Sequence, residues 1–182
     1  RAGSTQYDRT FMEALIRPGL GYGNWVSRSN YPLTGILPAG AGHLQIFISR
    51  RYMQDSWHIE RLLLRTDGFA SVCAPWSGGE MITRPLKFDG DNLEINYSTS
   101  AAGSVRVEIQ DAAGTPIPGH ALEDCPEIIG DEIERVVLWK QGPNVGHLTG
   151  RPVRLRFAMR DADIFSLRFF NSASTSGVGC SI

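Results

Sequence analysis

The sequence predicts an all-β protein, an antiparallel two-sheet β-sandwich of jelly-roll type with an N-terminal hairpin extension. Twenty glycines and ten prolines punctuate the 182 residues. The short runs between them alternate apolar and polar residues, which is typical of half-buried strands. Long helices are nearly excluded, because Gly or Pro interrupts the sequence every eight to twelve residues or so. We expect the extension to span residues 1–65 and the sandwich to span residues 66–182.

The extension contains one predicted hairpin. Its strands are residues 44–51 and 58–65, joined by a polar turn at Met53–Ser56. A stretch rich in Gly, Pro and Asn, residues 17–42, precedes the hairpin and has little periodicity. A structureless segment of this length is unusual inside a compact domain unless it is functional or belongs to a larger unit.

The sandwich strands are predicted from period-two alternation. In chain order they are residues 80–88, 93–97, 105–109, 133–140, 153–160 and 164–170. The apolar positions of the two clearest strands are the expected core: Val105, Val107, Ile109, Val153, Leu155, Phe157 and Met159. The residues between them, such as Glu108 and Gln110, are expected to face water. Asp161 and Asp163 are interpreted as a hairpin turn between the last two strands.

Charge and hydropathy exclude several classes of partner. Eighteen Lys and Arg against nineteen Asp and Glu give a net charge of −1, so nothing favours nucleic acid or an anionic membrane surface. The apolar runs are far shorter than the roughly 18–20 residues that span a bilayer. The chain begins with Arg1 and shows no signal-peptide pattern, which indicates a processed or internal start.

The three cysteines, Cys73, Cys125 and Cys180, lack metal-site spacing. Their odd number allows one disulfide and leaves at least one free thiol. The four histidines are scattered without the spacing of a ligand pair, so they indicate neither a metal site nor a catalytic base. We therefore expect no resident cofactor, with calcium as the one alternative discussed below.

Aromatic residues give the candidate ligand-binding positions, because sugar rings stack on exposed aromatic faces while polar neighbours hold their hydroxyl groups. Trp76 lies in a Gly- and Pro-rich loop and is the best exposed candidate, whereas Trp139 ends an alternating strand and is expected in the core. The other candidates come from the extension: Trp25, Arg28, Asn30, Tyr31 and Trp57. The alternative is that these aromatic residues only pack the hairpin.

An acidic stretch from residue 123 to 134 is open to three interpretations. It is a solvated connection that pairs with nearby arginines, or a calcium site with Asp124, Glu127 and Asp131 as ligands. The third is that Glu123, Asp124 and Glu127 supply carboxylates for glycoside hydrolysis. The spacing does not match the EF-hand loop, and the solvated connection is the preferred interpretation.

Several short segments carry a resemblance to a known family. They are Leu64–Ser71, Gly78–Glu80, Thr83–Pro85, Asn96–Gly103, Val107–Asp111, Pro116–Gly119, Glu123–Cys125, Gly130–Asp131 and Gly150–Phe157. In this order they resemble the C-terminal part of bacterial proteins similar to glycoside hydrolase family 32, over residues 11–170. Such proteins carry a five-bladed catalytic propeller followed by a β-sandwich. The resemblance implies that residues before about 65 are the end of a propeller blade and that the protein is extracellular or periplasmic.

The catalytic motifs of that family are not intact. Its Arg-Asp-Pro motif becomes Arg160-Asp161-Ala162, its Glu-Cys dipeptide is interrupted in Glu123-Asp124-Cys125, and its Asn-Asp-Pro-Asn-Gly motif is missing. Retaining hydrolysis needs two carboxyl groups about 5–5.5 Å apart. We therefore predict a non-catalytic accessory region that binds carbohydrate or stabilises a catalytic propeller of the same protein. The alternatives are a glycoside hydrolase and a purely structural sandwich.

Overall fold

The computed structural model describes Thr5 and residues 14–25 and 30–172, and it confirms the all-β, antiparallel fold class. The chain forms two compact units, Arg1–Phe69 and Ala70–Ile182, called here the first and the second unit. Each unit contains one antiparallel sheet. No helix among the described residues is long and apolar enough to cross a membrane.

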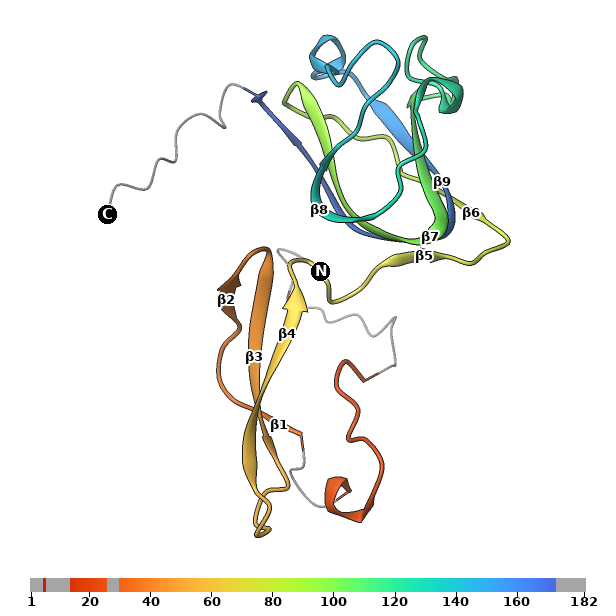
Figure 1. The fold of residues 1–182 in the computed structure, drawn as a ribbon. Coiled ribbons are helices and arrows are strands. Elements are labelled where there is room, and N and C mark those ends of the chain that lie inside the picture. The colour runs from red at the N-terminus through yellow and green to blue at the C-terminus, as the bar shows by residue number, and fades with distance from the viewer. Residues whose placement is uncertain (1–4, 6–13, 26–29, 173–182) are drawn as a thin grey trace. The chain divides into compact units, whose positions relative to one another are not determined.

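The sheet of the first unit is built on the predicted hairpin, which is confirmed. Strands β3 (His43–Arg50) and β4 (His58–Arg65) pair antiparallel over eight residues in unbroken register. Two short strands, β1 (Tyr31–Pro32) and β2 (Leu37–Gly40), share the other edge of β3 (Figure 1). A single 3₁₀ turn, η1 (Tyr22–Asn24), precedes them. Strand β3 is therefore the centre of the sheet, with β4 along one of its edges and β1 and β2 along the other.

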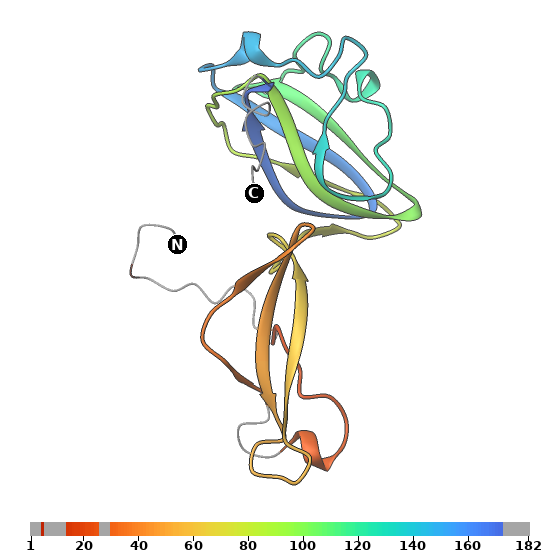
Figure 2. The same cartoon turned by 60° about the vertical axis from the view of Figure 1, so that its left-hand side comes forward.

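The sheet of the second unit has five strands and is strongly curled (Figures 1 and 2). Its bounds are β5 (Val72–Ala74), β6 (Gly79–Ile82), β7 (Asn92–Asp111), β8 (Asp131–Val136) and β9 (Val153–Phe170). The order is β5-β9-β7-β8, and β6 also pairs with β9. Two 3₁₀ turns, η2 (Leu122–Asp124) and η3 (Gly146–Leu148), lie in the connections after β7 and β8. This curled all-β arrangement is consistent with a β-sandwich.

In two places, a pair of strands predicted as separate forms one long strand in the structure. Residues 93–97 and 105–109 both belong to β7, and residues 153–160 and 164–170 both belong to β9. The predicted hairpin turn at Asp161 and Asp163 is therefore wrong. The two strands bend where Asp161 adopts a φ of 44° and Ser100–Gly103 have no partner in the β7–β9 register, which is also shifted between Asn96 and Tyr97. A Cβ on Gly103 would lie 2.3 Å from the Asp161 carbonyl oxygen, so the bend requires glycine there.

The predicted core residues are confirmed: Val105, Val107, Ile109, Val153, Leu155, Phe157 and Met159 are all at most 4% exposed. The prediction that the opposite face of β7 is wet is wrong at Glu108 and Gln110, which are buried. The connection after β7 covers this face, since the Leu122 backbone N–H donates to Glu108 Oε2 at 3.1 Å. Glu108 also accepts from Gln110 Nε2 and lies 3.4 Å from Arg156 Nη1, which compensates its buried charge.

Candidate functional site

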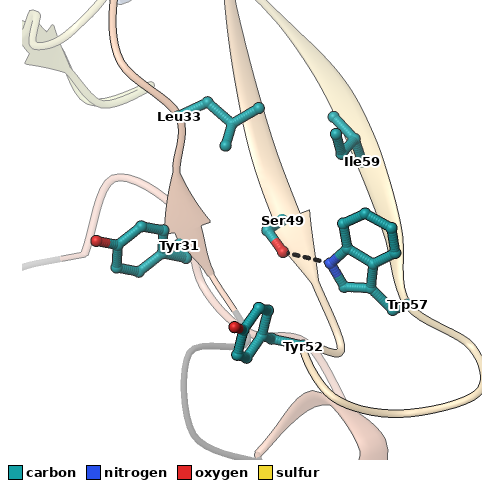
Figure 3. A pocket seen from close by; sticks show the side chains of 6 residues that line it. All are labelled: Tyr31, Leu33, Ser49, Tyr52, Trp57 and Ile59. Atoms are coloured by element: carbon teal, nitrogen blue, oxygen red, sulfur yellow. Dashed lines mark hydrogen bonds between the residues drawn. The ribbon is translucent and has the colours of Figure 1, made fainter.

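A cavity of about 520 Å³ opens on the sheet of the first unit (Figure 3). Its lining combines aromatic, aliphatic and hydroxyl-bearing side chains: Tyr31, Leu33, Ser49, Tyr52, Trp57 and Ile59. Concave, mostly apolar pockets of roughly 300–1,000 Å³ with a few polar groups are typical of small-molecule sites. The volume and the lining therefore make this cavity the candidate binding site.

Strand register places the side chains on one face. Tyr31 of β1 is paired with Ser49 of β3, and Ser49 is paired with Ile59 of β4. Directly paired residues of antiparallel strands point to the same face of the sheet. Leu33 extends the segment of β1 along β3, because its backbone N–H donates to the Phe47 carbonyl oxygen at 2.8 Å. Three neighbouring strand segments thus supply the floor of the cavity.

The β3–β4 turn supplies the two remaining aromatic residues, Tyr52 and Trp57. Arg51 and Met53 adopt positive φ values of 52° and 62°, which turn the chain sharply after β3. The turn is also closed by the Trp57 backbone N–H, which donates to the Gln54 carbonyl oxygen at 2.9 Å. This turn places Tyr52 and Trp57 at the end of the cavity near Ser49 (Figure 3).

One hydrogen bond fixes the indole ring of Trp57. Its Nε1 donates to Ser49 Oγ at 2.8 Å, as the dashed line in Figure 3 shows. Ser49 is 5% exposed while Trp57 is 51% exposed, so a buried anchor holds a half-open aromatic ring. Because the indole N–H is satisfied internally, the ring offers a ligand its apolar face.

Among the described residues, no lysine, arginine, aspartate or glutamate lines the cavity. An ion pair of the hairpin joins Arg50 Nε to Glu60 Oε2 at 2.6 Å. Arg50 and Glu60 follow Ser49 and Ile59 by one residue in their strands, so they point to the opposite face of the sheet. The cavity therefore suits an uncharged ligand with an apolar ring face and hydroxyl groups.

Sequence-predicted binding residues are divided among several places. Tyr31 and Trp57 meet in the cavity, whereas Trp25 and Asn30 do not line it. Trp25 Nε1 donates to the Gly19 carbonyl oxygen at 3.0 Å. Asn30 donates to the Ile16 carbonyl oxygen at 3.3 Å and accepts from Arg50 Nη1. Arg28 lies outside the described residues.

Trp76 belongs to the second unit and is 59% exposed. It lies in the connection between β5 and β6, and the Arg160 guanidinium carbon is 5.0 Å from the centroid of its ring. A guanidinium over an aromatic face is a cation–π contact. Trp76 thus offers an exposed aromatic platform on the second unit.

Four lining residues were missed by sequence reasoning: Leu33, Ser49, Tyr52 and Ile59. Ser49 and Ile59 are paired in the observed register, whereas the predicted strand bounds, which pair residue 51 with residue 58, would have paired Ser49 with Glu60. Tyr52 lies next to the predicted turn and was a visible aromatic residue. Leu33 carried no signal, since its place depends on the pairing of β1 with β3.

Acidic residues 123–134 serve as caps and ion pairs where contacts are present. Asp124 accepts from the Ala121 backbone N–H at 3.3 Å and pairs with Lys140 Nζ at 3.3 Å. Glu127 pairs with Arg106 Nη2 at 3.3 Å. Asp131 begins β8. Within the described part of the chain, no three His, Cys, Asp or Glu side chains are grouped so as to hold a metal ion.

Two of the three cysteines are described, and both are free thiols. Cys73 is exposed, and the Asp163 carboxylate is the main cause that raises the pKa of its thiol. Cys125 is buried, and burial raises its pKa. Raised pKa values keep both thiols protonated and weakly nucleophilic at neutral pH. Neither thiol has the activated character of a catalytic cysteine.

Comparison of the chain with protein-family models, with curated proteins and with solved structures gave no match in any of the three.

Proposed function

We propose that the chain is a non-catalytic, carbohydrate-binding accessory region and that its aromatic cavity binds a neutral sugar. The cavity supplies what such a ligand needs: the open indole face of Trp57 for stacking, and the hydroxyl-bearing side chains Tyr31 and Tyr52 beside it. The single observation that carries the proposal is the Ser49–Trp57 hydrogen bond, because it holds a half-exposed ring in one orientation without a ligand. A ring fixed in advance loses less conformational entropy on binding.

The sequence resemblance to glycoside hydrolase family 32 supports the choice of a sugar over other uncharged ligands. It also supports the proposal that the parent protein is extracellular or periplasmic and carries a catalytic propeller. Because the described residues that line the cavity carry no charge, we propose neutral oligosaccharides rather than uronates. Affinity is then expected to be insensitive to salt, since stacking and neutral hydrogen bonds involve little net charge.

The test is titration of the whole chain with neutral fructo-, xylo-, arabino- and gluco-oligosaccharides, followed by tryptophan fluorescence and calorimetry, with oligogalacturonate as the charged control. We expect a saturable signal with a neutral sugar. Trp57→Ala should abolish it, while Trp25→Ala, a change of another exposed tryptophan of the same unit, should leave it intact. Ser49→Ala should weaken sugar binding, because it removes the hydrogen bond that orients Trp57 but keeps the indole ring on which the sugar stacks.

Three results would contradict the proposal. Loss of binding in Trp76→Ala but not in Trp57→Ala would move the site to the second unit. No binding of any neutral sugar at millimolar concentration would favour a purely structural role. Release of reducing sugar that is abolished by Glu123→Gln or Asp124→Asn, with folding preserved, would show that the chain is itself a hydrolase.

A further inference from the structure

The two edges of the first unit's sheet are built differently. The edge formed by β1 and β2 consists of two short strands, contains Pro32 and Pro38, and has a register shift between Pro38 and Gly40. Short strands, prolines and bulges are the features by which proteins prevent further strand pairing. The edge formed by β4 has none of them: it is eight residues long, lacks Pro and Gly, and is regular along its whole length.

The hydrogen-bond pattern shows which backbone groups of β4 point away from β3. The Thr66 N–H donates to the Gly42 carbonyl oxygen at 2.8 Å, which continues the register of β3 and β4 by one residue. Bonded and non-bonded pairs alternate in an antiparallel ladder. The N–H and C=O groups of Ile59, Arg61 and Leu63 therefore point outward. Among the described residues, no backbone hydrogen bond occupies these three positions.

The side chains of these three residues share the face of the sheet on which the cavity lies. Ile59 is 51% and Leu63 is 55% exposed, and Arg61 lies between them and is also exposed. Within the described residues, no carboxylate forms an ion pair with Arg61. The edge thus presents an aliphatic, a cationic and an aliphatic side chain in alternation, above a row of outward-pointing backbone groups.

We propose that the β4 edge binds an extended strand of a partner polypeptide whose alternate residues are aliphatic, acidic and aliphatic. The partner's backbone would pair with the outward groups of Ile59, Arg61 and Leu63. Its acidic side chain would lie opposite Arg61, and its aliphatic side chains would cover Ile59 and Leu63. Strand addition of this kind gains affinity from main-chain hydrogen bonds and specificity from alternate side chains.

A second copy of the chain fits this edge poorly. Antiparallel pairing of β4 with β4 of another copy can place Arg61 opposite Arg61, which opposes like charges. Shifting the register by one step in either direction places Arg61 opposite Ile59 or Leu63, where it gains no carboxylate. Every such register brings cationic side chains together in the seam. The charge pattern therefore favours a partner strand that carries an acidic residue.

The experiment uses the whole chain labelled with ¹⁵N and two synthetic peptides, one with the sequence TVTETVT and the other with TVTKTVT. We expect the first to bind with a Kd below about 1 mM and to shift and protect from hydrogen exchange the amides of Ile59, Arg61 and Leu63. N-methylation of its Val, Glu and Val residues should abolish binding, because their N–H groups would face β4. N-methylation of the outer threonines should not abolish it.

A charge exchange separates strand addition from non-specific adhesion. Arg61→Glu should reverse the preference between the two peptides by roughly tenfold. Arg151→Glu, the same change at an exposed position of the second unit, should leave the preference unchanged. Equal binding of both peptides, shifts that map elsewhere, no binding at millimolar concentration, or a dimer that depends on β4 would each overturn the proposal. Sugar binding is measured separately with Trp57→Ala, so the two proposals can fail independently.

Discussion

Replacing Trp139 by alanine removes the indole from the core of the second unit. Trp139 is 3% exposed, its Nε1 donates to the Val107 carbonyl oxygen at 2.9 Å, and the His120 ring centroid is 5.0 Å from its own. Large-to-small changes of a buried Trp typically cost about 3–5 kcal/mol. The unpaired Val107 carbonyl adds about 1 kcal/mol. We therefore expect the free energy of unfolding of this unit to fall by about 4–6 kcal/mol.

Trp76→Ala is the matched control, since it removes the same side chain from an exposed position. Among the described residues, its ring contacts the Arg160 guanidinium, and such a contact is worth about 0.5–1 kcal/mol at an exposed site. The expected loss is therefore several-fold smaller than for Trp139→Ala. With a urea dependence of about 2 kcal/mol per molar, Trp139→Ala should lower the unfolding midpoint by about 2–3 M and Trp76→Ala by about 0.5 M or less.

The assay is hydrogen exchange mass spectrometry of peptides from β7 and β9 along a urea series. These strands belong to the second unit alone, so their exchange reports its unfolding even if the first unit unfolds separately. Equal midpoints for the two variants, or an unchanged midpoint for Trp139→Ala, would refute the argument that burial decides the cost.

Two further predictions concern the same unit. Leu155→Asp should prevent the second unit from folding, because the change places an unpaired charge at a fully buried position. Arg154→Ala, on the other face of β9, should lower the free energy of unfolding by less than about 1 kcal/mol. Hydrogen exchange of β9 peptides without urea distinguishes the two variants, and equal losses of stability would show that the faces are reversed. Burial lowers the pKa of His120 below its unfolded value, so the unfolded state binds more protons and stability should be lost as the pH falls below about 6.5. The urea midpoint should drop between about pH 7.5 and pH 5.5 and drop less in His120→Gln; an identical drop in both proteins would assign the effect to other groups.

Local pattern was sufficient to predict the elements that depend on nearest neighbours in the chain. The hairpin of β3 and β4 was predicted within one residue, because alternation and a polar turn define it without help from other segments. The core faces of β7 and β9 were predicted for the same reason. Each is set by period-two spacing alone.

Features that depend on distant segments could not be predicted in this way. The bend of β7 and β9 involves Gly103 and Asp161, which are far apart in sequence and carry the composition of an ordinary turn. Glu108 resembles a solvated residue until the connection after β7 covers it. Only Tyr31 and Trp57 of the six lining residues were predicted, because the floor of the cavity exists only after β1 pairs with β3.

The pairing of β7 with β9 also sets the order in which the second unit can assemble. The pair closest in sequence, Asp111 and Val153, is separated by about 40 residues, and the most distant pair, Asn92 and Phe170, by about 80. Loop-closure entropy rises with that separation, so pairing is expected to begin beside Asp111 and to extend past the bend toward Asn92. Contacts beside Asp111 then govern the folding rate, and contacts beside Asn92, which form last, govern how fast the unit opens.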